Sequence, residues 1–179
     1  MKKLFLLGML LCMTVGLSAQ DKPKNELAIS WGVGTTPQLV DVFTSALSGG
    51  LVDYSSSTQA ISAQYLRNLN KTWAVGAAAI YEGMESDDAN SNGKQNLISV
   101  MPVARAHWFN KAHFGMYSKV GVGACFWNEK LNGQTSNDVT VAYQVSPVCM
   151  EAGSESVRGF MEVGFGFQGI INLGVRFGF

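Results

Sequence analysis

The amino-acid sequence predicts an all-β protein, an eight-stranded antiparallel transmembrane β-barrel with a short helix in its first external loop. Apolar residues alternate with polar or small ones in eight separate segments, which is the period of a β-strand. Short and long connections alternate between most of these segments, as they do in membrane barrels. Only 15% of the 179 residues are charged, whereas soluble domains have about 25%.

The composition also excludes some classes of function. The chain has 13 Lys and Arg and 13 Asp and Glu, so its formal net charge is zero. A nucleic-acid-binding domain would carry a basic excess, and an acidic disordered chain would carry an acidic one. We therefore expect neither class, and no nucleic-acid partner.

A secretory signal peptide is predicted at residues 1–19. Met1–Lys3 is positively charged, an apolar stretch follows, and Ala19 is a small residue at the expected cleavage point, with cleavage at a neighbouring bond as the alternative. The apolar stretch has about 14 residues, fewer than the roughly 20 that a membrane-spanning helix needs. The remainder divides into an N-terminal segment at 20–24 and the barrel at 25–179.

Each of the eight predicted strands has one apolar face. In the first strand, Leu27, Ile29 and Trp31 alternate with Ala28 and Ser30. The same alternation occurs at residues 61–65, 73–82, 98–108, 116–126, 139–146, 158–167 and 171–179. An even number of alternating segments is typical of a closed antiparallel barrel.

The connections differ in length on the two sides of the predicted barrel. Short turns are expected at 68–71, 110–112 and 152–156, and long loops at 35–57, 84–94 and 128–137. The last connection, near Gln168-Gly169, is expected to be tight. Within the first long loop, Thr36-Pro37 followed by apolar residues up to Gly49-Gly50 predicts a short capped helix. This helix is interpreted as a lid on the barrel mouth, with a docking surface for a partner as the alternative.

The direction of the apolar face separates two kinds of eight-stranded barrel. A soluble lipocalin-like barrel directs its apolar face inward, and a membrane barrel directs it toward lipid. Here the polar face is rich in glycine and sparsely charged, which suits the narrow interior of a small barrel. Aromatic residues on the apolar face lie largely toward strand ends, where membrane barrels have their aromatic girdles: Trp31, Tyr65, Trp73, Tyr81, Trp108, Phe126 and Phe177. We therefore expect the apolar face to contact lipid.

An interior charge network is predicted from Arg105, Lys119, Glu162 and Arg176. A tight last turn would place Glu162 opposite Arg176, where the two charges would compensate each other, because burial of a lone charge is costly. Arg158 is a further candidate. The network is interpreted as structural, with a gated polar path as the alternative. Side chains should fill the interior of so small a barrel and leave no open pore.

The C-terminus resembles the β-signal of bacterial outer-membrane proteins at Asn172, Gly174, Phe177 and Phe179. With the predicted signal peptide and the eight strands, the mature chain resembles the small bacterial outer-membrane β-barrel family of the OmpA, OmpX and opacity-protein type. The resemblance implies an outer-membrane location, contact with outer-membrane lipid, and recognition of the last strand by the barrel-assembly machinery. The short last hairpin and the first-loop helix depart from the family pattern, so no particular member is implied.

No metal or cofactor site is expected. Asp88, Asn90, Asn92 and Gly93 match the first half of a calcium-binding loop. The last ligand position is Ser99, where a bidentate Glu is needed. We therefore interpret this segment as an acidic, turn-rich hairpin loop.

No catalytic site is expected either. Some eight-stranded barrels modify outer-leaflet lipid with His and Ser, but His107 and His113 flank a short turn on the predicted periplasmic side. A His–Ser–acid site at the outer surface is therefore not available. Cys125 is predicted to face inward, opposite a residue near 140, and Cys149 outward, so no disulfide is expected.

The sequence thus predicts a closed, non-enzymatic barrel that serves as an envelope component or presents loops at the cell surface. Two alternatives remain open. One is a binding module in which the loops at 35–57 and 128–137 hold an extracellular ligand or partner. The other is a lipid-modifying barrel enzyme.

Overall fold

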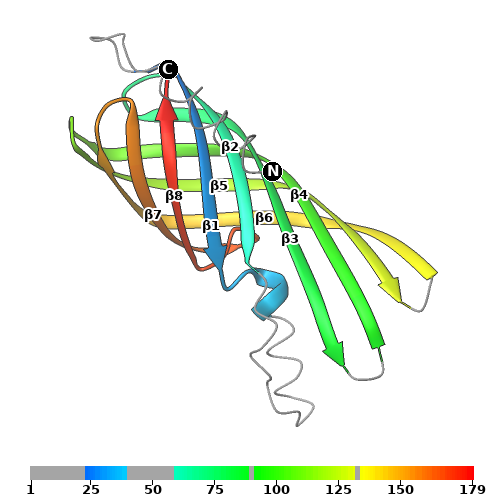
Figure 1. Ribbon diagram of the computed structural model, residues 1–179. Helices are drawn as coiled ribbons and strands as arrows, with labels where there is room; N and C mark the ends of the chain where they lie inside the picture. The colour runs from blue at the N-terminus through cyan, green and yellow to red at the C-terminus, as the bar shows by residue number, and fades with distance from the viewer. Residues whose placement is uncertain (1–22, 40–58, 89–90, 132–133) are drawn as a thin grey trace, which may run out of the picture.

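The computed structural model describes residues 23–39, 59–88, 91–131 and 134–179, and these form one closed antiparallel barrel (Figure 1). The strands are β1 (Asn25–Val33), β2 (Ala60–Asn68), β3 (Trp73–Asp88), β4 (Ser91–Asn110), β5 (Phe114–Leu131), β6 (Gln134–Gly153), β7 (Val157–Gly166) and β8 (Ile171–Gly178). Each strand pairs with its neighbours in sequence, and β1 pairs with β8 to close the barrel. The predicted eight-stranded antiparallel barrel is confirmed.

The barrel is polar inside and apolar outside. In β1, Leu27, Ile29 and Trp31 are exposed, while Ala28 and Ser30 are buried. The alternation follows from the pleat, which directs successive side chains to opposite faces of the sheet. A smaller apolar cluster fills part of the interior: Ala60, Leu66, Ala74, Ala78, Ile80, Leu97, Met101, Val103, Cys125, Ala142 and Phe167.

Two of the predicted long loops are extensions of β-hairpins. β3 and β4 remain paired as far as Asp88 and Ser91, and β5 and β6 as far as Leu131 and Gln134. Both hairpins project well beyond the ends of β1 and β8 in Figure 1. The prediction of loops here is wrong because it relied on apolar alternation. The apolar alternation ends before the tips of these hairpins, yet the backbone ladder continues to them.

The connection between β7 and β8 is longer than predicted. Pairing between β7 and β8 ends at Val163 and Ile171. Beyond this point β7 remains paired with β6 as far as Gly166, which lies opposite Gln144. Phe167 and Gln168 then turn into the barrel and are buried. Gly166 and Gly169 take φ angles of 144° and 100°, which residues with a side chain rarely adopt. The prediction of a tight turn near residue 169 is therefore wrong.

This longer connection changes the register of the last hairpin. Glu162 lies opposite Asn172, and Arg176 lies opposite Arg158. The predicted Glu162–Arg176 pair does not form. The prediction centres the hairpin at residue 169, whereas the observed pairs, such as Val157 with Phe177, centre it at residue 167.

A register shift in β6 turns Cys149 inward, contrary to the prediction. The regular pairing with β7 is interrupted between Val145 and Val148, and Pro147 lies between them. Proline has no N–H to donate to a ladder and is typical of bulges. The bulge adds a residue and reverses the inward–outward phase, so Cys149 is fully buried. Cys125 lies opposite Thr140, near the predicted position, and both cysteines are free.

Only the start of the predicted first-loop helix lies within the described residues. Residues 36–39 are helical, and the Leu39 N–H donates to the Thr35 carbonyl at 3.0 Å. The signal peptide at 1–19 lies outside the described residues, as does part of the calcium-like motif. In the part of the chain that is described, no helix is long and apolar enough to cross a membrane.

Candidate functional site

The interior of the barrel holds a balanced set of charges. The buried side chains include four acidic and four basic residues: Glu26, Glu82, Glu151, Glu162, Arg105, Lys119, Arg158 and Arg176. The four residues that were predicted as an interior network are all among them. They lie in two connected clusters rather than around a single Glu162–Arg176 pair.

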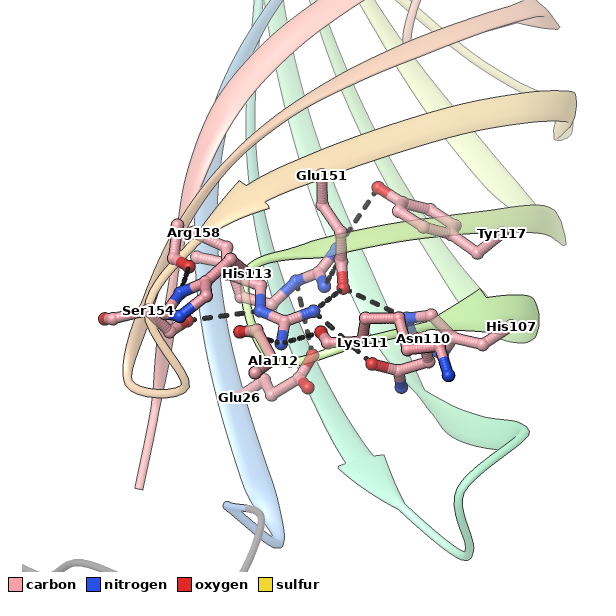
Figure 2. Close-up of polar contacts among 12 residues, drawn as sticks. Glu26, His107, Asn110, Lys111, Ala112, His113, Tyr117, Glu151, Ser154 and Arg158 are labelled. Atoms are coloured by element: carbon pink, nitrogen blue, oxygen red, sulfur yellow. Dashed lines mark hydrogen bonds and ion pairs between the residues drawn. The ribbon is translucent and has the colours of Figure 1, made fainter.

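The first cluster lies near the short-turn end and is centred on Glu151 (Figure 2). Glu151 accepts hydrogen bonds from Arg158 Nη1 at 2.5 Å and from Arg176 Nη1, and His107 Nε2 lies 3.3 Å from its Oε1. Glu26, across the barrel on β1, accepts from Arg105 Nη2 at 2.5 Å. Arg176 Nε lies 3.2 Å from Glu26 Oε2. Arg176 therefore bridges the two carboxylates.

Tyr117 connects this cluster to the second one. The guanidinium groups of Arg105 and Arg176 lie 5.3 and 5.2 Å from the centre of its ring, in cation–π contact. Its hydroxyl accepts from Arg176 Nη2 at 3.1 Å and donates to Glu162 Oε1 at 2.8 Å. The hydroxyl of the fully buried Tyr117 thus links Arg176 of the first cluster to Glu162 of the second.

The second cluster surrounds Glu162 in the middle of the barrel. Lys119 Nζ forms a close ion pair with Glu162 Oε2, and Asn172 Nδ2 donates to the same oxygen at 3.0 Å. Lys119 also lies 3.4 Å from Gln64 Oε1. Glu162 is therefore compensated by Lys119 from β5 rather than by Arg176, because the observed register places Asn172 opposite Glu162.

Arg158 joins two short turns at the end of the barrel. Its Nη2 donates to the carbonyls of Lys111 and Ala112, both at 3.1 Å, and its Nε donates to the Ser154 carbonyl at 3.2 Å. Figure 2 shows these contacts around the Arg158 guanidinium. With Glu151 as a further acceptor, this side chain orders the β4–β5 and β6–β7 turns relative to each other.

Two segments enter the barrel at the opposite end. Thr35 Oγ1 and Gln38 Nε2, at the start of the first-loop helix, donate to Glu82 Oε1 at 2.6 and 2.8 Å. Gln168, from the β7–β8 connection, donates to Ser62 Oγ at 3.2 Å across the barrel. A Cβ atom at position 32 would overlap the Gln168 carbonyl oxygen, so Gly32 permits this close approach.

The short-turn end opens into a polar cavity of about 490 Å³. Glu26, His107, Glu151, Arg158 and Arg176 line it, and their charged groups are mostly paired with one another. No cluster of His, Cys, Asp and Glu that could hold a metal ion occurs among the described residues. The arrangement is that of a charge-compensated interior.

The predicted charge network omits three of the four interior acids, Glu26, Glu82 and Glu151, although alternation places Glu82 on the polar face. Glu26 and Glu82 lie on the polar phase of β1 and β3, so alternation by itself could have identified them. Glu151 could not be placed in this way because the bulge at Pro147 reverses the phase before it. A proline inside a strand pattern was the available signal.

The residues of the predicted assembly signal divide between the two faces of β8. Asn172 is buried and bonds Glu162, whereas Phe179 is exposed on the outside. A Cβ at Gly174 would come within 2.5 Å of the Ile29 carbonyl oxygen and 2.6 Å of the Ser30 Cβ. Glycine is therefore required here by the close approach of β1, apart from any role in assembly.

No known protein family matches the chain, and no curated protein does. Among solved structures, it is similar to Ail, the attachment invasion locus protein of Yersinia pestis, with a TM-score of 0.51 and 10% identity over 87% of this chain and 95% of that one. A structure of Ail in complex with the heparin analogue sucrose octasulfate has a TM-score of 0.45 and 14% identity over 86% and 94% of the two chains. The chain thus has an Ail-like eight-stranded barrel fold, which agrees with the resemblance to small bacterial outer-membrane barrels.

Proposed function

We propose that this chain is an integral protein of the bacterial outer membrane, a closed and non-enzymatic barrel that supports the envelope or presents its long hairpins at the surface. The observation that carries the proposal is the distribution of side chains. Large apolar residues on every strand are exposed on the outside, while 18 polar or charged residues are buried inside. Soluble monomers rarely expose apolar patches beyond a few hundred Å².

The outer face of the barrel also carries very few charged side chains. Among the strand residues with described side chains, Arg67 and Asp138 are the only exposed charged ones, and both lie near a strand end or in a hairpin extension. The closed ladder also satisfies the backbone hydrogen bonds that lipid cannot satisfy. A lipid environment accounts for both features.

Aromatic residues define one edge of the proposed membrane zone. The registers of neighbouring strands align Trp31, Ile61, Tyr81, Ile98 and Phe126 in one continuous outer row. Trp73 and Trp108 lie toward the other end. Tryptophan and tyrosine are favoured at the two membrane–water interfaces, so these residues support a membrane zone between the two sets.

The interior chemistry supports a non-enzymatic role. His107 is buried beside Glu151, and His113 contacts the carbonyl of Gly153 at the short-turn end. The interior carboxylates are held by arginine, lysine and amide donors. These groups are engaged in structural contacts, which disfavours the lipid-modifying alternative.

The test of location and topology is cysteine labelling on whole cells. Cys125 and Cys149 are fully buried, so a single introduced cysteine reports its own position. A membrane-impermeant maleimide is expected to label Thr135→Cys, in the β5–β6 hairpin, on intact cells, and Glu155→Cys only after the outer membrane is permeabilised. Equal labelling of both variants on intact cells, or recovery of the protein in the soluble fraction, would contradict the proposal.

A closed barrel is expected to conduct poorly. Tyr117, Arg105, Lys119 and Met101 are fully buried within the barrel, and interiors of eight-stranded barrels are filled by side chains. Purified protein in planar lipid bilayers should therefore show no large, stable conductance, while a known large porin in the same bilayers serves as the positive control. Long-lived porin-like openings would show that the interior is a channel.

A further inference from the structure

The short-turn end of the barrel carries an excess of exposed positive charge. Among the described residues, Lys24, Arg67, Lys71 and Lys111 are exposed there, and Glu155 is the one exposed acid. Apart from the cation–π contact of Lys111, the described residues provide no hydrogen-bond or ion-pair partner for the side chains of Arg67, Lys71 and Lys111. These cations are not needed to balance the interior, where acidic and basic residues are equal in number.

Three of these cations lie on the same side of the short-turn end, which we call the rim. Lys71 is in the β2–β3 turn and Lys111 is in the β4–β5 turn, and the turns are joined because Asn110 Nδ2 donates to the Lys71 carbonyl at 3.5 Å. Arg67 is on the outer face of β2, opposite Val75 of β3. Glu155 belongs to the β6–β7 turn. The side of the rim between β2 and β5 is therefore basic.

The same side of the rim carries exposed aromatic and apolar groups next to the cations. Trp73 and Trp108 are 51% and 57% exposed, and Phe109 packs against Phe114 with ring centres 6.0 Å apart. Lys111 Nζ lies 6.0 Å from the centre of the Phe109 ring. Interfacial aromatic side chains lie at headgroup depth, so cations beside them lie at the level of lipid phosphates.

We propose that Arg67, Lys71 and Lys111 form a binding surface for anionic phospholipid headgroups on the β2–β5 side of the short-turn rim, a proposal that rests on the membrane location proposed above. Headgroup phosphates would bind at these cations, while the acyl chains lie along the apolar outer face. Exposed acidic side chains are absent from the described residues of this part of the rim. A lipid with net negative charge is therefore favoured over a zwitterionic one.

The experiment measures which lipid lies next to Trp73 and Trp108. A Trp31→Phe/Trp127→Phe background leaves these two as the tryptophans of the chain. In vesicles, quenching by brominated phosphatidylglycerol is compared with quenching by brominated phosphatidylcholine to give a relative binding constant. We expect a several-fold preference for phosphatidylglycerol that weakens at high salt. Each of Arg67→Gln, Lys71→Gln and Lys111→Gln should lower the preference by about twofold, because the several-fold total is divided among three cations.

Two controls separate the possible results. Lys71→Arg/Lys111→Arg keeps the charges and should keep the preference, and Lys94→Gln/Lys130→Gln, at the far hairpins, should leave it unchanged. If the protein that retains Arg67, Lys71 and Lys111 is quenched equally by the two lipids, the proposed headgroup-binding surface is wrong. The proposed membrane location would be unaffected by that result. Absence of quenching by either lipid would instead contradict the membrane location itself.

Discussion

Replacing Glu151 with glutamine is expected to lower the free energy of unfolding by about 3–5 kcal/mol, the usual cost of removing one partner from a buried ion pair. Glu151 is 3% exposed and contacts His107, Arg158 and Arg176. Glutamine has nearly the same shape but no negative charge. Two buried guanidinium groups would then lose an anionic partner at once.

The loss should extend beyond the substituted side chain. Arg158 joins the β4–β5 and β6–β7 turns, and Arg176 links Glu151 to Glu26 and Tyr117. Both arginines depend on Glu151 for their position. We therefore expect the short-turn end to loosen, with faster amide hydrogen exchange at residues 111–113 and 154–156.

Urea unfolding in detergent micelles or lipid vesicles, followed by tryptophan fluorescence, measures this effect. Glu155→Gln is the matched control because Glu155 is exposed in the neighbouring turn, and its stability should change by less than about 0.5 kcal/mol. A Glu151→Gln loss below about 1 kcal/mol would indicate that water or a rearranged arginine compensates for the missing charge. The ion-pair network would then not be essential for stability.

Introducing arginine at Ala77 is expected to make folding into a bilayer less favourable by about 2–4 kcal/mol. Ala77 is exposed on the outer face of β3, midway between Trp73 and Tyr81. These aromatic residues lie at opposite edges of the proposed membrane zone. The new guanidinium would therefore lie near the middle of the lipid.

The same substitution would have little effect on a soluble barrel. An exposed arginine in water would be neutral for stability. Leu69→Arg is the matched control, since Leu69 is 59% exposed but lies in the β2–β3 turn, where the cost should be about 0–1 kcal/mol. Folding into vesicles, followed by heat-modifiable gel mobility and urea titration, distinguishes the two variants. Equal tolerance of arginine at both positions would contradict the membrane zone.

Strand β1 and the β7–β8 connection show why the strands could be predicted while some side-chain contacts between them could not. The alternation of Leu27, Ile29 and Trp31 with buried small residues depends on the pleat of one strand and on the two environments that it separates. Each strand therefore carries its own signal. The partner of Glu162 depends instead on the course of residues 167–169, which turn inward because Gln168 bonds Ser62 and Gln144 inside the barrel.

The bulge in β6 likewise limits what alternation can predict about the interior charges. Alternation placed Arg105, Lys119 and Glu162 on the inner face, where the structure also has them. It could not place Glu151, the acceptor of three basic side chains, because the phase changes at Pro147. The direction of a side chain beyond a bulge depends on pairing with both neighbouring strands.

Sequence alone determined that this chain forms eight alternating strands with an apolar outer face and a sparsely charged polar one. These properties depend on the local period of the backbone and on composition, and both are present in each segment separately. Tertiary structure alone decided which interior charges meet, how the β7–β8 connection enters the barrel, and that two predicted loops are hairpins. These features arise from contacts between strands far apart in sequence, where a shift of one residue moves a side chain to the other face.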